Sequence, residues 1–258
     1  MRNEEIAGNR DTTLLKIIAA VCMIVDHVGV RLCDNMTEMR LIGRLAFPIY
    51  VWCLVVGACY TRNELKYGLR LLLVGLIAQP CYMLGLHHGW DRISVFGTLL
   101  TGYLGILGIR HKWYGSQFWA PLLALALANA VKMDYGWRGV LLIMLLYLSR
   151  KNRGAVAAVM IAFCLFWGGN TKTVTDLFGI PLTGGFFSED IVQPFLRLQT
   201  LALLSLPLIV WPRERRFGMP HWLSYIVYPG HLLILWILQI AMGLTTARAG
   251  LALLIPGL

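Results

Sequence analysis

The sequence predicts an all-α integral membrane protein, a polytopic helix bundle of about nine transmembrane helices (roughly 8–10). Hydrophobic residues make up 58% of the chain and charged residues 14%, whereas a soluble domain has about 25% charged residues. Apolar runs near the ~20 residues that a membrane helix needs recur along the whole length. Little sequence separates these runs, so we expect residues 1–258 to form a single transmembrane domain.

The first expected span follows a short polar N-terminus and has no small-residue cleavage site, so we interpret it as a permanent helix. The fifth to eighth runs are short, and runs of about 10–14 residues are also typical of buried or re-entrant helices. The number of spans over residues 117–211 therefore stays open. The nine expected spans are residues 14–32, 41–60, 68–86, 93–109, 117–131, 136–149, 155–167, 199–211 and 223–244.

The net charge of +10 is explained by short basic loops against anionic lipid headgroups, and we expect no nucleic-acid partner. With the N-terminus inside, the predicted inner segments hold more than half of the 23 Lys and Arg residues. This bias predicts a cytoplasmic N-terminus and an external C-terminus. The longest connection, residues 168–190, then faces outward and is long enough to contact a substrate.

The six cysteines lie mostly within apolar runs, and no two form a Cys-x-x-Cys pair. We interpret them as small core residues and not as metal ligands or a disulfide framework. The adjacent His87 and His88 lack a third ligand nearby, so we predict no metal site.

The first span carries two neighbouring ionisable residues, Asp26 and His27, within the apolar run MIVDHVGV. Each costs roughly 3 kcal/mol in hydrocarbon even on the gentler insertion scales, and such residues are functional by default. On a helix, Lys16 lies on nearly the same face as His27, about 16 Å away. Asp26 points about 100° away from His27, so a cation on a neighbouring helix is an equally good partner for it. Arg44, which opens the second span, is the nearest such charge.

A second set of basic residues lies between the second and third spans. Arg62, Lys66 and Arg70 are spaced by four, so on a helix they would form one basic stripe at the inner surface. Such a stripe suits a phosphate-bearing ligand from the cytoplasm. Ordinary positive-inside anchoring explains the same residues, and for Lys66 we favour it.

Further polar groups lie at membrane depth in later spans. His231 follows Pro229 by two residues and lies near Tyr228, so it is a second imidazole beside an expected helix kink. Gln79 precedes Pro80 and predicts either a hydrogen bond between helices or the wall of a cavity.

Four stretches occur in order from the first span to the last: LLKIIAAVCMIVDHVG, RLIGRLAFPIYVWCLVVGACYTRN, KYGLRLLLVGLIAQPCY and YIVYPGHL. Together they resemble the TraX family, named for the conjugative pilin acetylase, most strongly over residues 14–82 and 225–232. The resemblance implies an inner-membrane protein of bacteria that uses acetyl-coenzyme A (acetyl-CoA) as donor. Lys16 and His27 are also similar in spacing to the first-span pair of the membrane O-acyltransferases, whose basic member is more often Arg.

From these residues and this resemblance we expect a membrane-embedded acetyltransferase that acts on an amine or hydroxyl of a peptide, glycan or lipid. Neutral histidine is the usual base for acyl transfer, so His27 is the expected base, Asp26 an organising carboxylate and His231 the reserve base. The expected donor-binding residues are Lys16, Arg44, Arg62 and Arg70. The expected substrate-binding residues are Asn63, Gln79 and Tyr228.

Two alternatives stay open at this point. Buried Asp and His residues also suit a proton-coupled transporter, although the chain shows no internal repeat. The third interpretation is a non-catalytic assembly component of a conjugation or secretion machine. Binding of coenzyme A distinguishes the enzyme from the transporter, and replacement of His27 without loss of function would favour the assembly component.

Overall fold

The computed structural model describes residues 5–182, 185–214, 218 and 221–255. This part of the chain is mostly helical, as the sequence predicts, with one short β-hairpin. The chain divides into two compact units. The first comprises Glu5–Cys53 and Ser149–Gly218, and the second comprises Leu54–Leu148 and Met219–Leu258. The expected single transmembrane domain stays a prediction.

Helix α1 (Thr12–Arg31) opens the helical part of the first unit and packs against α2 (Thr37–Arg44). The carboxylate of Asp11 accepts a hydrogen bond from the Leu14 N–H at 3.2 Å and so caps the start of α1. This bond satisfies one of the N–H groups that have no partner within the first helical turn. The cap explains why α1 begins two residues before the predicted span.

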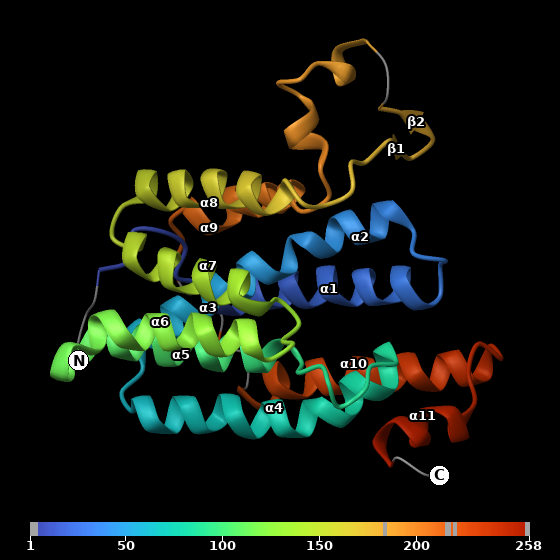
Figure 1. Ribbon diagram of the computed structural model, residues 1–258, viewed down its shortest axis with the longest axis horizontal. Helices are drawn as coiled ribbons and strands as arrows, with labels where there is room; N and C mark the ends of the chain where they lie inside the picture. Colours follow the sequence, from blue (N-terminus) through green and yellow to red (C-terminus); the bar gives the residue numbers. More distant parts are fainter. Residues whose placement is uncertain (1–4, 183–184, 215–217, 219–220, 256–258) are drawn as a thin grey trace. The chain divides into compact units, whose positions relative to one another are not determined.

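In the first unit, the first half of α3 (Ala46–Tyr60) is largely buried, and α8 (Arg153–Gly168) contributes several further buried residues. The ring of Trp167 on α8 packs edge-on against Phe47 of α3, with centroids 6.1 Å apart. Beside α8 run the 3-10 segment η4 (Thr200–Ser205) and the short helix α9 (Leu206–Val210) (Figure 1).

The long connection between α8 and η4 carries the hairpin of β1 (Asp176–Leu177) and β2 (Ile180–Pro181). Its two loop residues, Phe178 and Gly179, both have positive φ, as a two-residue type I′ turn requires. The Phe178 N–H donates to the Glu38 carboxylate at 2.9 Å, which ties the hairpin to α2. The connection also contains two 3-10 turns, η2 (Gly185–Ser188) and η3 (Gln193–Leu196).

In the second unit, α4 (Glu64–Leu86) packs against α5 (Val95–His111), α10 (His221–Ala241) and α11 (Ala247–Leu254), and α5 packs against α6 (Ser116–Ala130) (Figure 1). A Cβ on Gly85 of α4 would lie 2.7 Å from the Leu232 carbonyl oxygen of α10, so these helices approach closely only because Gly85 has no side chain. The other elements are η1 (Trp113–Gly115) and α7 (Gly136–Ser149).

Every predicted span overlaps helical structure, but the lengths differ. Among the described residues, three segments are long and apolar enough to cross a membrane: Thr12–Arg31, Thr37–Tyr60 and Glu64–Leu86. The eighth predicted span is a 3-10 segment followed by a five-residue helix. The helix α11 was not predicted. The protein is therefore a helical membrane protein by these three segments and several shorter apolar helices, and the number nine stays a prediction.

The cysteines largely follow the sequence analysis, and several prolines lie within helices. Pro80 and Pro229 lie inside α4 and α10, where a missing N–H breaks the hydrogen-bond ladder. Pro48 and Pro207 instead lie in the first turns of α3 and α9, where the backbone N–H has no helical partner to lose. Five of the six cysteines are buried, as expected of small core residues, and Cys33 is exposed.

Candidate functional site

The carboxylate of Asp26 lies between two arginines of α2. Nη2 of Arg44 donates to both carboxylate oxygens, at 3.1 Å each. Nε of Arg40 lies 3.0 Å from Oδ1 of the same group. The exposed fractions of the Asp26 and Arg44 side chains are 13% and 14%, so the charges are largely removed from solvent. We call these three residues the Asp26 cluster.

Two local features of the sequence create this cluster. Arg40 and Arg44 are four residues apart, so they project from one face of α2. A Cβ on Gly43 would overlap the Asp26 side chain, and a Cβ on Gly29 would lie 2.5 Å from Cβ of Met39. The two glycines therefore let α1 and α2 approach closely enough for the arginines to reach Asp26.

Asp26 has on the neighbouring helix the cation that the sequence analysis named. Its carboxylate binds the neighbouring helix through Arg44, as one of the two interpretations predicted. Nη1 of Arg44 also donates to the side-chain oxygen of Gln199 at 3.4 Å. Arg44 thus joins α1 to the segment before η4.

Lys16 and His27 lie on α1, which is unbroken from Thr12 to Arg31. The eleven-residue separation therefore corresponds to about 16 Å along one helical stripe, as predicted. Both side chains are partly buried. His27 lies about one turn before the end of α1, and Lys16 lies about one turn after its start.

A cavity of about 610 Å³ lies beyond the end of α1. We call it the distal hollow. Arg40 belongs both to its lining and to the Asp26 cluster, so the hollow is in contact with the cluster. Its lining is mixed in charge and consists of Asp34, Asn35, Met36, Thr37, Glu38, Arg40, Lys172, Thr173, Val174, Thr175, Asp176 and Leu198.

The predicted basic stripe is only partly helical. The structure starts α4 at Glu64, so Arg62 lies before the helix, and only Lys66 and Arg70 can share a helical face. The prediction of one stripe through all three residues is wrong in this respect. Asn63 is the N-cap: its side-chain oxygen accepts from the Lys66 N–H at 2.9 Å. Arg62 and Arg70 are exposed.

Gln79 of α4 binds the backbone before α5 with both ends of its amide. Its nitrogen donates to the Arg92 carbonyl at 2.7 Å, and its oxygen accepts from the Ser94 N–H at 2.9 Å. The structure therefore gives Gln79 the packing role that the sequence allowed, as a bond between elements.

The imidazole of His231 lies within α10 beside a buried Tyr228, with ring centroids 5.6 Å apart. Its Nδ1 is 2.8 Å from the Val227 carbonyl oxygen. A carbonyl oxygen only accepts, so Nδ1 carries a proton, and Nε2 of the neutral ring is then the acceptor.

The sequence analysis missed a charged cluster in the second unit. Glu64 lies 2.9 Å from Nη1 of Arg110 and 2.5 Å from Nε2 of His111. The Arg110 side chain is 8% exposed, and its Nη2 donates to the Ala58 carbonyl at 2.9 Å. The signal was an acid shortly before one predicted span, residues 68–86, and an Arg-His pair directly after another, residues 93–109. We call these three residues the Glu64 cluster.

The predicted site residues thus fall into two sets. Lys16, Asp26, His27 and Arg44 belong to the first unit, and Arg62, Asn63, Arg70, Gln79, Tyr228 and His231 belong to the second. The fold and the first set define a helical membrane protein with a largely buried ion cluster beside a histidine on a helix long enough to span a membrane.

Comparison with known proteins then identifies the family. The model of the TraX protein family matches residues 11–239, so the chain belongs to the TraX family. It is 27% identical to a Dichelobacter nodosus protein described as "Probable fimbrial assembly protein FimC, serogroup H1", over 86% of this chain and 92% of that one. It is 27% identical to "Protein TraX" of Escherichia coli, over 62% of this chain and 63% of that one.

A third relative is an uncharacterised protein of Rickettsia prowazekii, 36% identical over 68% of this chain and 70% of that one. No solved structure matches the chain. The family named in the sequence analysis is therefore confirmed, and the relatives include a protein described as a component of fimbrial assembly.

Proposed function

We propose that the protein is a membrane-embedded acetyltransferase that moves an acetyl group from cytoplasmic acetyl-CoA to an acceptor amine or hydroxyl. The acceptor belongs to a pilin-like peptide N-terminus, a glycan or a lipid. Membership of the TraX family supports this class, and the relative described as a fimbrial assembly protein supports a pilin-like acceptor. The observation that carries the proposal is the Lys16–His27 stripe on an unbroken spanning helix, next to the Asp26 cluster.

In the proposed reaction, the imidazole of His27 accepts a proton from the acceptor nitrogen or oxygen. That atom forms a bond to the thioester carbonyl carbon of acetyl-CoA, and the carbon–sulfur bond breaks. The thiolate takes up the proton from the imidazolium, which leaves an amide or ester, free coenzyme A and a neutral histidine. No oxidant or metal is needed to balance this transfer.

The Asp26 cluster has a positioning role in this proposal. Because two arginines neutralise Asp26, the residue next to His27 is held in one place without a net negative charge at the histidine. The distal hollow, which shares Arg40 with the cluster, is the proposed entrance for the acceptor. Both features lie within the first unit.

We further propose that the protein lies in the bacterial inner membrane with a cytoplasmic N-terminus. The donor then arrives at the Lys16 end of α1 and the acceptor at the His27 end. Cationic side chains suit the phosphates of the donor, and Lys16 is the proposed donor-binding residue of the first unit. Donor binding by Arg62 and Arg70, which belong to the second unit, stays a prediction. Arg44 is proposed to act indirectly, because its guanidinium already binds Asp26 and Gln199.

The test is acetyl transfer to an accepted amine or hydroxyl by the purified protein in proteoliposomes. His27→Ala should lose at least the ~10²-fold expected for a missing general base, while it still binds coenzyme A. His27→Gln should fail similarly, because its amide cannot take up the proton. Gel filtration of each variant checks its folding. Full activity in His27→Ala together with loss in His231→Ala would move the base to α10.

A non-catalytic role in fimbrial assembly is the second candidate, because the Dichelobacter nodosus relative that spans most of the chain is described by that role. This role predicts that His27→Ala supports fimbrial assembly in cells as well as the parent does. If the parent protein itself shows no acetyl transfer, fimbrial assembly in cells is the measurement that tests this second candidate.

A further inference from the structure

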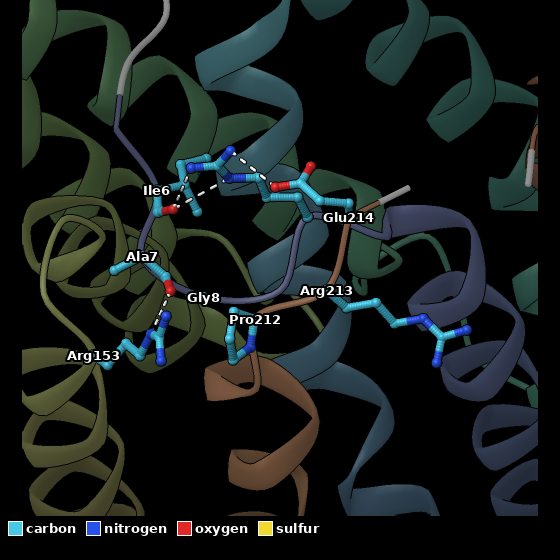
Figure 2. Close-up of a pocket in the computed structure, with 8 residues that line it drawn as sticks. Ile6, Ala7, Gly8, Arg153, Pro212, Arg213 and Glu214 are labelled. Carbon is cyan, nitrogen blue, oxygen red and sulfur yellow. Dashed lines mark hydrogen bonds and ion pairs between the residues drawn. The ribbon is translucent and has the colours of Figure 1, made fainter. Parts of the chain in front are cut away.

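A second cavity, of about 270 Å³, lies at the other end of the first unit, where α1 and α8 begin and α9 ends. We call it the N-terminal hollow. Figure 2 shows Ile6, Ala7 and Gly8 along one wall, with Pro212 and Glu214 across from them. Its complete lining is Ile6, Ala7, Gly8, Arg10, Arg153, Pro212, Arg213 and Glu214.

One wall of the hollow is residues 5–11, which we call the N-terminal strap. Backbone hydrogen bonds hold it at both sides: the Ala7 N–H donates to the Arg150 carbonyl, and the Asn9 N–H donates to the Ile209 carbonyl, at 2.9 and 2.8 Å. A Cβ on Gly8 would lie 2.5 Å from that same Ile209 oxygen. The strap is therefore a fixed wall that only glycine fits at this position.

The arginine side chains that line the hollow differ in how many of their nitrogens already donate hydrogen bonds within the protein. Arg153 donates from Nε to the Ala7 carbonyl at 2.8 Å (Figure 2). Its two terminal nitrogens make no hydrogen bond within the described part of the chain. Nε and Nη2 of Arg10 donate to the Ile6 carbonyl, and its Nη1 lies 3.3 Å from the Glu214 carboxylate.

Arg213 has a different role from the other two arginines. Its Nε lies 3.3 Å from Oδ2 of Asp11, whose side chain is fully buried. Figure 2 shows its guanidinium turned away from Arg153. Arg213 therefore pairs with a buried carboxylate, and Arg153 and Arg10 are the other two arginines that line the hollow.

We propose that the N-terminal hollow binds a phosphate group, held by the terminal nitrogens of Arg153 and by Nη1 of Arg10. Guanidinium groups match phosphate oxygens with two parallel hydrogen bonds. Glu214 presents a carboxylate to Arg10 in the position that a phosphate oxygen would take, and its side chain is 81% exposed and free to be displaced. The carboxylate thus competes with the ligand.

The size of the hollow limits the ligand. Pockets that enclose a whole drug-sized ligand have about 300–1,000 Å³, and this hollow has about 270 Å³. It suits a phosphate-bearing head, with the remainder of the ligand outside. Both a phosphorylated nucleotide, such as the bisphosphate part of coenzyme A, and an anionic lipid headgroup carry this chemistry.

The position of the hollow favours the donor of the proposed acetyl transfer, and this step rests on the proposed function. The hollow lies at the start of α1, about one turn before Lys16 and roughly 22 Å along the helix from His27. Phosphates bound there would leave the pantetheine arm to extend along the Lys16–His27 stripe toward the histidine.

The experiment measures binding to the purified full chain by isothermal titration, with adenosine 3′,5′-bisphosphate and coenzyme A as probes. Arg153→Ala should weaken both by about tenfold or more, the effect expected when hydrogen bonds between charged groups are lost. Lys151→Ala is the matched control, because Lys151 is an exposed cation two residues away that does not line the hollow. Equal weakening in both variants would show diffuse attraction and overturn the site.

A gain in affinity guards against variants that merely misfold. Glu214→Gln removes the competing carboxylate and should tighten binding of the bisphosphate by roughly two- to fivefold, the range of an exposed ion pair. Unchanged affinity in Glu214→Gln together with unchanged affinity in Arg153→Ala would overturn the proposal.

Nanodiscs of phosphatidylcholine with and without phosphatidylglycerol distinguish the two sources of phosphate. Stabilisation of the parent by phosphatidylglycerol, lost in Arg153→Ala, with no binding of the bisphosphate, would assign the hollow to a lipid headgroup. Binding of the bisphosphate that depends on Arg153, without acetyl transfer to any acceptor, would keep the site and refute the proposed function. Acetyl transfer by the parent, together with unaltered coenzyme A affinity in Arg153→Ala, would support the proposed function and refute the phosphate site.

Discussion

Nη2 of Arg44 lies 3.1 Å from both carboxylate oxygens of Asp26, so that one guanidinium nitrogen fixes the buried acid of the first spanning helix. Arg40 approaches the same carboxylate at 3.0 Å. The acid next to His27 is thereby part of a bond between α1 and α2. This arrangement explains how an ionisable residue persists in an apolar helix, because its charge is paired and hydrogen-bonded.

Removal of this acid should destabilise the protein strongly. Asp26→Ala leaves two partly buried arginines without a carboxylate between them, and breaking a buried ion pair costs about 3–5 kcal/mol. Thermal unfolding in detergent, followed by circular dichroism, measures the loss. Asp190→Ala is the control, because Asp190 is an exposed carboxylate of the same unit. Similar unfolding temperatures for the two variants would contradict the role of the Asp26 cluster.

The close approach of α1 and α2 should be sensitive to a single methyl group. Gly43→Ala places a Cβ within the space of the Asp26 side chain, and overpacking of this kind costs about 1–3 kcal/mol. Gly230→Ala is the matched control in α10, because its Cβ would meet its nearest neighbour at an ordinary 3.7 Å. Alanine also favours a helix over glycine by about 0.8–1.0 kcal/mol, so Gly230→Ala should be neutral or stabilising by the same thermal measurement.

The sequence predicted the helices well because long apolar runs report directly on helices in a membrane. It also named Arg44 as a partner for Asp26, since Arg44 opens the neighbouring predicted span and is the nearest such charge. The Glu64 cluster escaped prediction, because Glu64 and Arg110 are 46 positions apart and pattern alone does not state which helix ends meet. The same limit explains the N-terminal hollow, which joins residues near positions 10, 153 and 213.

The ends of the elements were less predictable for a local reason. Asn63 caps α4, so the helix starts at Glu64 and Arg62 falls outside it. Several neighbouring polar residues can each cap a helix, and Thr, Arg and Asn precede this one. The sequence alone therefore does not fix the residue at which the helix starts. The hairpin of β1 and β2 has only two residues in each strand, too few for an alternating pattern.

The Glu64 cluster should be a stabilising element of the second unit. Glu64→Ala removes the carboxylate from Arg110, whose side chain is 8% exposed, and should cost about 3–5 kcal/mol. Glu64→Gln should recover part of this loss, because its amide oxygen still accepts one hydrogen bond. Lys132→Ala is the control, since its ion pair with Asp91 is exposed and such pairs contribute only about 0–1 kcal/mol. Equal effects of Glu64→Ala and Lys132→Ala on urea unfolding would refute this prediction.

The proposed orientation predicts which side of the membrane each end of the first unit faces. In a background that lacks the six native cysteines, Glu189→Cys in the long connection should react with an impermeant thiol reagent in intact cells. Lys151→Cys, at the end where α8 begins, should react only after the membrane is opened. Both positions are exposed, so access to the side chain does not bias the comparison. The opposite pattern of labelling would show that the protein has the opposite orientation in the membrane.

The hydrogen bond of the His231 ring allows an experiment that distinguishes a structural role of this residue from a role as catalytic base. Nδ1 donates to the Val227 carbonyl, one helical turn earlier, and an asparagine amide nitrogen can occupy a similar position and donate to the same oxygen. If His231 is structural, His231→Ala should lose about 0.5–1.5 kcal/mol of stability, the net value of one hydrogen bond, and His231→Asn should restore it with full acetyl transfer. If Nε2 of His231 is the base, His231→Asn should fold normally but lose at least the ~10²-fold of general-base catalysis.

We expect the structural result, because the proposed function assigns the proton transfer to His27. Thermal unfolding and acetyl transfer measured on the same preparations distinguish the two cases.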